Sequence, residues 1–208
     1  MNQIDIYGDI GESFWAESIS AVEVKAQLAE MSGDVTVRIN SGGGDVFDGI
    51  AIYNLLEQYD GQVNVKVDAL AASAASVIAM AGDTIEMADN ALMMIHEPWT
   101  IALGTSTDFA KTAELLDKIR DSIVTTYQAK SELSTDEISA MMKEETWFSA
   151  DEAISNGFAT AKTGVNAKFN NSIAKPWMNK APEIKEDKPD MSFINLQKRK
   201  LKLLQADA

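Results

Sequence analysis

Two serines in a segment of small residues and the single histidine of the chain are the candidates for nucleophilic catalysis. Ser73 and Ser76 lie in the segment 69–82, in which all the remaining residues are apolar or glycine. His96 follows the apolar segment 91–95. A serine attacks a carbonyl carbon only when a neighbouring base takes its proton, and histidine is the usual base. These residues would allow acyl transfer, although serines that bond the preceding turn of a buried helix would explain the segment equally well.

A second candidate feature is the run of glycines Gly42, Gly43 and Gly44, which is followed by Asp45. It lacks the Gly-Lys-Ser/Thr ending of a phosphate-binding loop, and the carboxylate of Asp45 would repel a phosphate. Glycines instead let backbone N–H groups come close to a substrate carbonyl, because no Cβ stands in the way. A simple tight turn is the alternative interpretation.

The elements that must position these residues alternate between strand and helix patterns. Short apolar or alternating runs predict strands at 4–7, 35–40, 62–68, 84–87 and 91–95. The first strand is followed by a predicted helix from Ser20, the second by one after the glycines, and the third by the Ala/Ser segment itself. This order predicts an α/β fold with a parallel sheet. The glycines, Ser73 and His96 would then meet at the carboxyl edge of that sheet.

Further along the chain, Ser-x-x-Glu patterns beginning at Ser20, Ser134 and Ser149 predict helix N-termini, and Gly157 is a predicted helix stop. A long helix opening at Ser106 and Thr107 carries one apolar stripe, and we interpret it as a packing helix whose length suits a subunit contact. The stripe consists of Phe109, Ala113, Leu116, Ile119, Ile123 and Tyr127. Glu144 and Glu145 could each orient a histidine, although adjacent glutamates are also common on solvated surfaces.

Composition narrows the classes of function. The chain has 208 residues, 46% of them hydrophobic, no cysteine and a net charge of −14. The negative charge argues against nucleic acid as a partner, and one histidine rules out a multi-imidazole metal site within one subunit. We therefore expect no metal and no cofactor. The N-terminus has no secretory signal and no apolar run reaches the ~20 residues of a membrane span, so a cytoplasmic protein without a membrane partner is expected.

Charge also divides the chain into two regions. Residues 180–208 carry a net charge of +2, which leaves −16 for residues 1–179. We expect a folded domain over 1–161, followed by a flexible linker and a basic amphipathic tail over 162–208. The amphipathic part, 191–204, could be a partly ordered tail, a docking segment or an extension removed by self-cleavage.

Four segments of the chain, in order, resemble motifs of the Clp protease proteolytic subunit. Ile39–Gly44 is similar to its Ile-Asn-Ser-Pro-Gly-Gly loop, and Ala71-Ala72-Ser73 to its Ala-Ala-Ser nucleophile helix. Met94–Pro98 resembles its Met-Ile-His-Gln-Pro, and Trp147–Ala153 its Phe-Leu-Ser-Ala-x-Glu-Ala. The resemblance covers about residues 4–160 and implies the spiral of ββα units that this family shares with the crotonases.

The resemblance also implies roles for individual residues. Ser73 would be the nucleophile and His96 the general base, while Ser76 would only pack. The backbone N–H groups of Gly44 and Ala74 would form the oxyanion hole. The family's triad aspartate, two residues before the aromatic, is replaced by Glu145, and Glu144 remains the alternative. The substrate-binding residues would be Gly42, Gly43, Asp45, Val46 and Phe47, along which an extended substrate would pair as an added strand.

Among members of this family, the motif Glu-Thr-Trp-Phe-Ser-Ala-Asp-Glu-Ala looks most like the head maturation (prohead) proteases of tailed phages and prophages. The implied activity is a serine endopeptidase acting on capsid or scaffold protein inside an assembling phage head, as a homo-oligomeric ring. Almost nothing precedes the predicted strand at 4–7, so we expect cleavage without an ATP-driven unfoldase. The alternatives are a crotonase-like acyl-CoA enzyme and a catalytically inactive assembly protein of the same fold.

Overall fold

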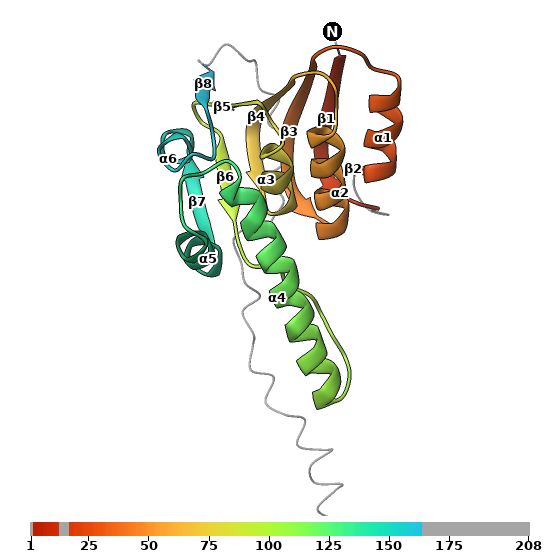
Figure 1. The fold of residues 1–208 in the computed structure, drawn as a ribbon, viewed down its shortest axis with the longest axis vertical. Helices are drawn as coiled ribbons and strands as arrows, with labels where there is room; N and C mark the ends of the chain where they lie inside the picture. The colour runs from red at the N-terminus through yellow and green to blue at the C-terminus, as the bar shows by residue number, and fades with distance from the viewer. Residues whose placement is uncertain (1, 13–16, 164–208) are drawn as a thin grey trace, which may run out of the picture. The chain divides into compact units, whose positions relative to one another are not determined.

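The computed structural model describes residues 2–12 and 17–163, and these residues are built around one mixed β-sheet (Figure 1). Its main path runs in the order β2-β1-β3-β4-β5-β8, with every pair along it parallel. The strands of this path are β1 (Asn2–Ile10), β2 (Ser18–Ile19), β3 (Val35–Gly44), β4 (Val63–Ala72), β5 (Thr84–Ala88) and β8 (Ala161–Thr163). The predicted α/β class with a parallel sheet is confirmed.

The register of the sheet sorts its side chains into an apolar face and a polar face. The apolar row Ile4, Val37, Val65 and Ile85 lies across four neighbouring strands, and each of these residues is at most 1% exposed. The residue after each of them points to the opposite face, because side chains alternate along a strand. That second row reads Asp5, Arg38, Lys66 and Glu86, and Lys66 and Glu86 form an ion pair at 3.1 Å.

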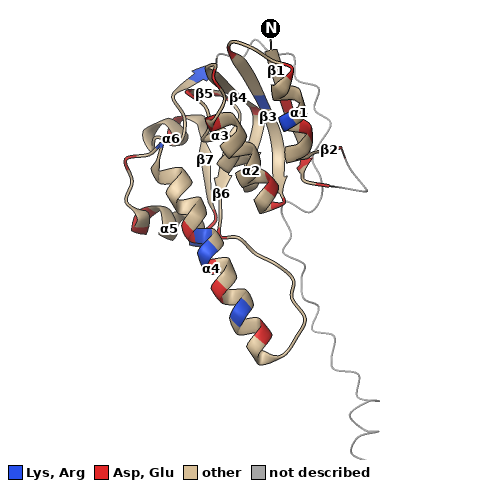
Figure 2. Cartoon of the chain, turned by 45° about the vertical axis from the view of Figure 1, so that its right-hand side comes forward, with Lys and Arg blue, Asp and Glu red and all other residues tan. Residues whose placement is uncertain are grey.

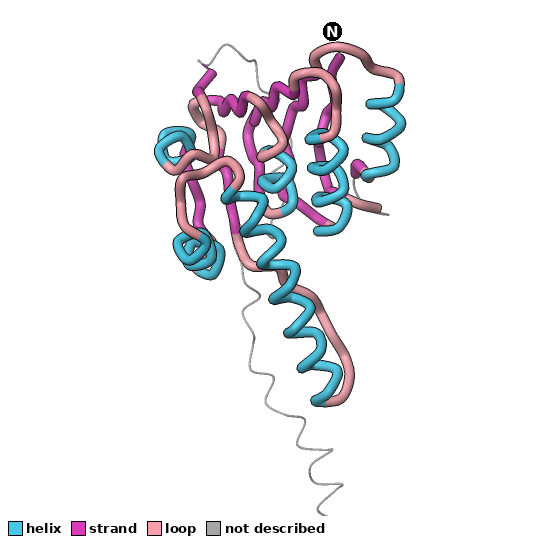
Figure 3. Tube along the Cα trace, in the orientation of Figure 1, coloured by secondary structure: helices cyan, strands magenta, loops and turns pink. Residues whose placement is uncertain are grey.

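Three helices follow the first strands and lie side by side in front of the sheet (Figures 1 and 3). They are α1 (Ala21–Ala29), α2 (Val46–Glu57) and α3 (Ala74–Ala79). The predicted capping box at Ser20 is present, since its hydroxyl accepts from the N–H of Glu23 and the Glu23 carboxylate accepts in return. Buried Ile52, Leu56 and Ile78 contribute to the core from these helices.

Two short strands lie off the main path and complete the edge near the functional residues. β6 (Leu92–Ile95) runs parallel to the end of β4, pairing Leu70–Ala72 with Leu92–Met94. β7 (Thr146–Ser149) then pairs antiparallel with β6, between α5 (Thr135–Lys143) and α6 (Ala150–Ser155). The capping boxes predicted at Ser134 and Ser149 begin these two helices, and Gly157 follows the second with φ +80°.

α4 (Ser106–Gln128) is the long helix, and only its C-terminal half packs against the sheet domain. Ile119, Ile123, Val124 and Tyr127 are buried, whereas Phe109 is 51% exposed. The predicted packing stripe is therefore correct only from Ile119 onward. The other half of α4 projects from the sheet (Figure 1) and carries acidic and basic side chains interspersed along its length (Figure 2).

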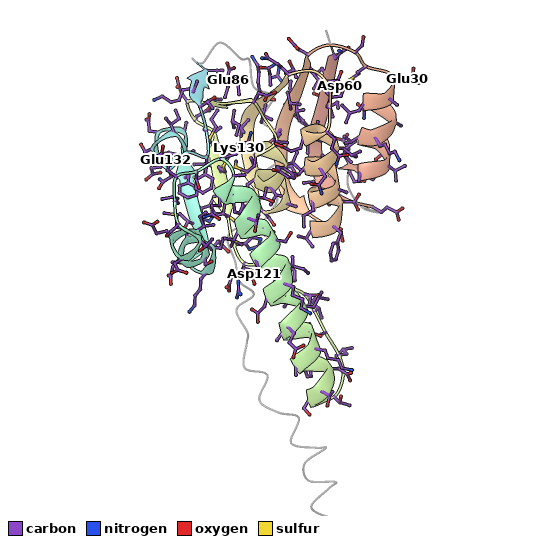
Figure 4. The ribbon with its side chains drawn as sticks, viewed as in Figure 1. Glu30, Asp60, Glu86, Asp121, Lys130 and Glu132 are labelled. Atoms are coloured by element: carbon purple, nitrogen blue, oxygen red, sulfur yellow. The ribbon has the colours of Figure 1, made fainter. Side chains whose placement is uncertain are left out.

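The C-terminal end of α4 is held to the body by the residues that follow it. Lys130, which is labelled at this end of the helix in Figure 4, donates a hydrogen bond from Nζ to the carbonyl of Gly82 at 3.1 Å. Ser131 donates from its buried hydroxyl to the carbonyl of Tyr127 at 3.1 Å. The Lys130 bond ties this end of α4 to the turn that follows α3, and the Ser131 bond closes the end of the helix itself.

The boundary expected at residue 161 falls inside β8, whose residues 161–163 pair with Glu86–Ala88 of β5. The described residues, 2–12 and 17–163, belong to one compact unit. The expected linker and basic amphipathic tail lie outside the described residues.

The strand predicted over 62–68 extends four residues further than predicted, into the segment 69–82. Residues 69–72 belong to β4, and α3 begins only at Ala74. Alanine favours helices, but Ala71 pairs with both Ser41 of β3 and Met93 of β6, so pairing within the sheet overrides that preference. Ser73 therefore occupies the turn between a strand and a helix.

Candidate active site

The backbone at Ser73 has an unusual conformation. Its φ is +56° and ψ −127°, and its N–H donates to the carbonyl of Met94 at 3.0 Å. Within the described residues, Ser73 and Glu145 are the two non-glycine residues with positive φ. Such conformations cost about 1–3 kcal/mol each and are found preferentially at functional sites. The sharp strand-to-helix turn at Ser73 is thus a structural reason to place the reactive centre there.

His96 reaches Ser73 because of the pairing between β4 and β6. Ala72 lies opposite Met94, so the residues that follow these strands emerge side by side. The Oγ atom of Ser73 and Nε2 of His96 are 2.8 Å apart, which is hydrogen-bonding distance. The structure therefore brings together the two residues that the sequence predicted as nucleophile and base.

The environment of His96 favours its neutral form. Burial lowers the pKa of the imidazole below its usual value, while the negative charge of Glu145 acts in the opposite direction and raises it. Burial is the larger of the two effects. A neutral imidazole can accept the proton of a serine hydroxyl, so at neutral pH His96 has the protonation state that a general base requires.

Glu145 lies close enough to influence His96, although no hydrogen bond joins the two side chains. Its Oε1 accepts instead from the indole Nε1 of Trp147 at 3.2 Å. Glu145 follows α5 and has a φ of +51°. The end of α5 is bonded to the residue after His96, since the N–H of Glu97 donates to the carbonyl of Met142 at 3.1 Å. Glu144 is the C-cap of α5 and is not among the groups that shift the pKa of His96. The electrostatics therefore favour Glu145.

The glycine segment lies directly against Ser73. A Cβ built on Gly43 would be 2.6 Å from the Cβ of Ser73, so only glycine permits this approach. The buried hydroxyl of Ser41 fixes the segment, since it donates to the carbonyl of Gly8 at 2.7 Å and accepts from the N–H of Gly43 at 3.1 Å. Gly44 is the next residue and pairs with Ile10 of β1.

The N–H of Ala74 is available to a ligand. Ala74 is the first residue of α3, so it has no acceptor four residues earlier in its own helix. Within residues 2–12 and 17–163, no other group accepts a hydrogen bond from it. A free N–H beside the hydroxyl of a candidate nucleophile is the arrangement that an oxyanion hole requires.

The segment predicted to bind an extended substrate, Gly42–Phe47, consists of the end of a strand and the start of a helix. Gly42 and Gly43 belong to β3, whereas Val46 and Phe47 form the first turn of α2. The carboxylate of Asp45 accepts from the N–H groups of Phe47 and Asp48 at 2.9 Å, which makes Asp45 a helix cap. The pairing of an extended substrate along Gly42–Phe47 stays a prediction. The side chain of Phe47 is 60% exposed.

Ser76 lies one helical turn after Ser73 and is completely buried, as expected for a packing residue. Its hydroxyl is 2.6 Å from the carbonyl oxygen of Ser73 and 2.8 Å from the hydroxyl of Tyr127 in α4.

The sequence did not reveal the hydrogen bonds of Tyr127 and Trp147. Tyr127 was one apolar position of a helical stripe, and Trp147 was one aromatic of a motif, so no local signal indicated their hydrogen bonds.

A family model described as Clp protease matches residues 2–161 of this chain. The chain belongs to the Clp protease family. It is accordingly a serine-type peptidase by family, within the class of hydrolases. The match spans every residue of the candidate site, from Gly42 to Glu145.

The relatives with similar sequences are proteolytic subunits. The chain is 31% identical over 157 residues to the ATP-dependent Clp protease proteolytic subunit of Leuconostoc citreum, covering 74% of this chain and 78% of that one. It is 28% identical over 155 residues to the protein of the same description from Bacteroides fragilis, covering 74% of this chain and 75% of that one. These similarities extend over most of both proteins.

A solved structure shows the same fold. A point mutant of ClpP1 from Listeria monocytogenes superposes with a TM-score of 0.69 at 23% sequence identity, covering 79% of this chain and 92% of that one. The expected Clp protease-like fold is thereby confirmed for the described domain. None of the helices in the described ranges is long and apolar enough to cross a membrane. The same ranges hold no group of three or more His, Cys, Asp or Glu side chains placed to hold a metal ion.

Proposed function

We propose that this chain is an endopeptidase in which Ser73 is the nucleophile, His96 the general base and Glu145 the triad acid. The observation that carries the proposal is the 2.8 Å contact between Ser73 Oγ and His96 Nε2 at a strained strand-to-helix turn. A crotonase-like acyl-CoA enzyme would have no use for this pair, and an inactive assembly protein would have no reason to keep it in place.

The reaction follows from these positions. His96 Nε2 takes the proton of Ser73 as Oγ bonds to the carbonyl carbon of the scissile peptide. The carbonyl oxygen becomes an oxyanion, which the N–H groups of Ala74 and Gly44 would stabilise. The imidazolium then gives its proton to the leaving amine, so the peptide C–N bond breaks and an acyl ester remains on Ser73. Water activated by His96 hydrolyses the ester and restores the free serine.

Glu145 contributes by stabilising the imidazolium. Its carboxylate already raises the pKa of His96, which is the direction needed when the ring becomes charged. Hydrogen bonding to His96 Nδ1 requires its side chain to turn from Trp147 Nε1, where it rests in this structure. We propose that this rearrangement accompanies substrate binding or assembly into a homo-oligomeric ring.

The chemistry is tested with a fluorophosphonate probe, which reacts only with an activated serine. We expect the full-length chain to be labelled at Ser73, and the labelling to be lost in His96→Ala. Labelling at another serine, or equal labelling without His96, would contradict the proposal. An absence of any labelling and any peptide hydrolysis would favour the inactive assembly protein.

For the natural substrate, we propose capsid or scaffold protein during phage head maturation, in the host cytoplasm within the assembling head. The support is the motif Glu145–Ala153, which resembles that of the head maturation proteases. Removal of the tail, residues 162–208, by self-cleavage would be consistent with a role in head maturation. Purified protein should cleave an assembled prohead substrate without added ATP. A strict requirement for an unfoldase and ATP would overturn the proposed independence.

Self-cleavage has a separate test. Intact mass measurement of the purified wild type beside Ser73→Ala would show a shorter wild type if the tail is removed in this way. Equal masses would show that the tail is retained.

A further inference from the structure

A buried chain of hydroxyl groups connects α4 to the peptide group between Ser73 and Ala74. Ser76 is 0% exposed and Tyr127 is 1% exposed, so neither hydroxyl can rely on water. Ser76 Oγ is 2.6 Å from the Ser73 carbonyl oxygen, which can only accept, so Ser76 is the donor in that bond. Its Oγ then accepts from the Tyr127 hydroxyl, 2.8 Å away. The order of donation is Tyr127 to Ser76 to the Ser73 carbonyl.

The carbonyl that ends this chain belongs to the same peptide unit as the N–H of Ala74. A peptide unit is planar, so fixing the direction of its C=O also fixes the direction of its N–H. The N–H groups of Ser76 and Val77 donate to the same carbonyl at 2.9 and 3.4 Å, so that oxygen has three donors, of which the Ser76 hydroxyl is the nearest. Hydrogen bonds to a carbonyl polarise its amide, which makes the N–H on the other side a stronger donor.

We infer that Ser76 and Tyr127 are positioning residues that aim and polarise the Ala74 N–H as an oxyanion donor. The inference rests on the proposed function and adds two residues to it, neither of which touches the substrate. Ser73 has a strained conformation at the start of the six-residue helix α3, and the hydroxyl chain adds a side-chain bond to the backbone bonds that hold its carbonyl. α4 supplies the support from its packed half, where the ring of Tyr127 meets Phe158 edge-on at 5.6 Å between centroids.

Two substitutions remove hydroxyl groups of the chain and change the surrounding packing little. Tyr127→Phe removes one oxygen and keeps the ring on Phe158. Ser76→Ala removes both bonds, to Ser73 and to Tyr127. The matched control is Ser131→Ala, since Ser131 is also buried and its hydroxyl also donates to a backbone carbonyl at this end of α4, but that carbonyl belongs to Tyr127.

The measurements are kcat and KM on a peptide substrate and the inhibition constant of a peptide boronate, which forms a tetrahedral adduct. Complete loss of an oxyanion donor lowers kcat by about 10²–10³-fold. Ser76→Ala leaves the Ala74 N–H in place but weakens its alignment, so we expect kcat to fall by about tenfold. For Tyr127→Phe we expect about threefold, because Ser76 can still donate to Ser73. KM should stay unchanged, and the boronate inhibition constant should rise by the factor by which kcat falls.

The double variant tests whether Tyr127 acts through Ser76. In a Ser76→Ala background, Tyr127→Phe should lower kcat no further. Ser131→Ala should lower the melting temperature while leaving kcat and boronate binding at wild-type values. If Ser76→Ala and Tyr127→Phe behave like Ser131→Ala in an active, labelled enzyme, the inference is wrong and the proposed function stands. If the wild type neither hydrolyses peptide nor reacts with the fluorophosphonate probe, both fall.

Discussion

Ser73 Oγ and His96 Nε2 are 2.8 Å apart although 23 residues separate them in the chain. The contact depends on two parallel strands that end at the same edge of the sheet, since β4 pairs with β6 immediately before the two residues. It also depends on the N–H of Ser73, which donates to the carbonyl of Met94 and holds the turn against β6. The proposed catalytic pair is therefore a product of strand pairing.

Ser73→Ala should abolish peptide cleavage and leave the fold intact, because the methyl group of alanine occupies less space than the serine side chain. Peptide hydrolysis by purified protein measures the first effect and circular dichroism the second. Ser139→Ala is a suitable control, since the hydroxyl of this half-buried serine only donates to the carbonyl of Thr135. Cleavage that persists in Ser73→Ala at the wild-type rate would remove the assignment of the nucleophile.

Glu145→Gln should lower kcat by about 10²- to 10⁴-fold, the range expected when a triad carboxylate is replaced by its amide. The matched change Glu144→Gln should have little effect, because Glu144 only ends α5 and does not influence the pKa of His96. Steady-state kinetics on one peptide substrate compares the two. The reverse order of effects would transfer the acid role to Glu144.

The pH dependence of kcat/KM should have an acidic limb below about pH 6.5, the usual pKa of histidine, because burial lowers the pKa of His96. Activity requires the neutral ring, so it is lost as pH falls through this lowered pKa. Glu145 raises the pKa of His96, so Glu145→Gln should move the limb to still lower pH. A limb that moves to higher pH in this variant would contradict the electrostatic role of Glu145.

Gly43→Ala should destroy activity and destabilise the protein more than Gly33→Ala. Both glycines have positive φ, so each substitution carries about 1–2 kcal/mol of backbone strain. The new Cβ at Gly33 meets nothing within 4 Å, whereas at Gly43 it lies 2.6 Å from Ser73 and 2.8 Å from the carbonyl of Ala72. Urea unfolding and peptide hydrolysis distinguish strain from collision. Equal loss of stability in the two variants would show that the glycine segment can move away from Ser73.

Much of the architecture could be predicted from local signals. Alternating apolar residues at 35–40 and 62–68 predicted two strands, because one face of each must be buried. The Ser-x-x-Glu patterns at Ser20, Ser134 and Ser149 located three helix starts, because their side chains satisfy backbone N–H groups nearby in sequence. Motif resemblance supplied Ser73 and His96.

Other features could not be read from local sequence. Residues 69–72 look helical by composition but form the end of β4, since their backbone partners come from β3 and β6. Asp45 looked like part of a binding segment, yet its carboxylate starts α2. The projecting half of α4 has the same apolar periodicity as the packed half, and only the position of the sheet decides which half is buried.

The residue types and their order thus determined the fold class, the candidate nucleophile and the candidate base, because these follow from short-range patterns. Tertiary structure alone decided the geometry around them. It set the conformation of Ser73 at φ +56°, the distance to His96, the rest position of Glu145 on Trp147, and the hydroxyl chain from Tyr127 through Ser76. Each of these depends on groups far apart in sequence, whose distances are fixed only when the sheet and α4 have packed.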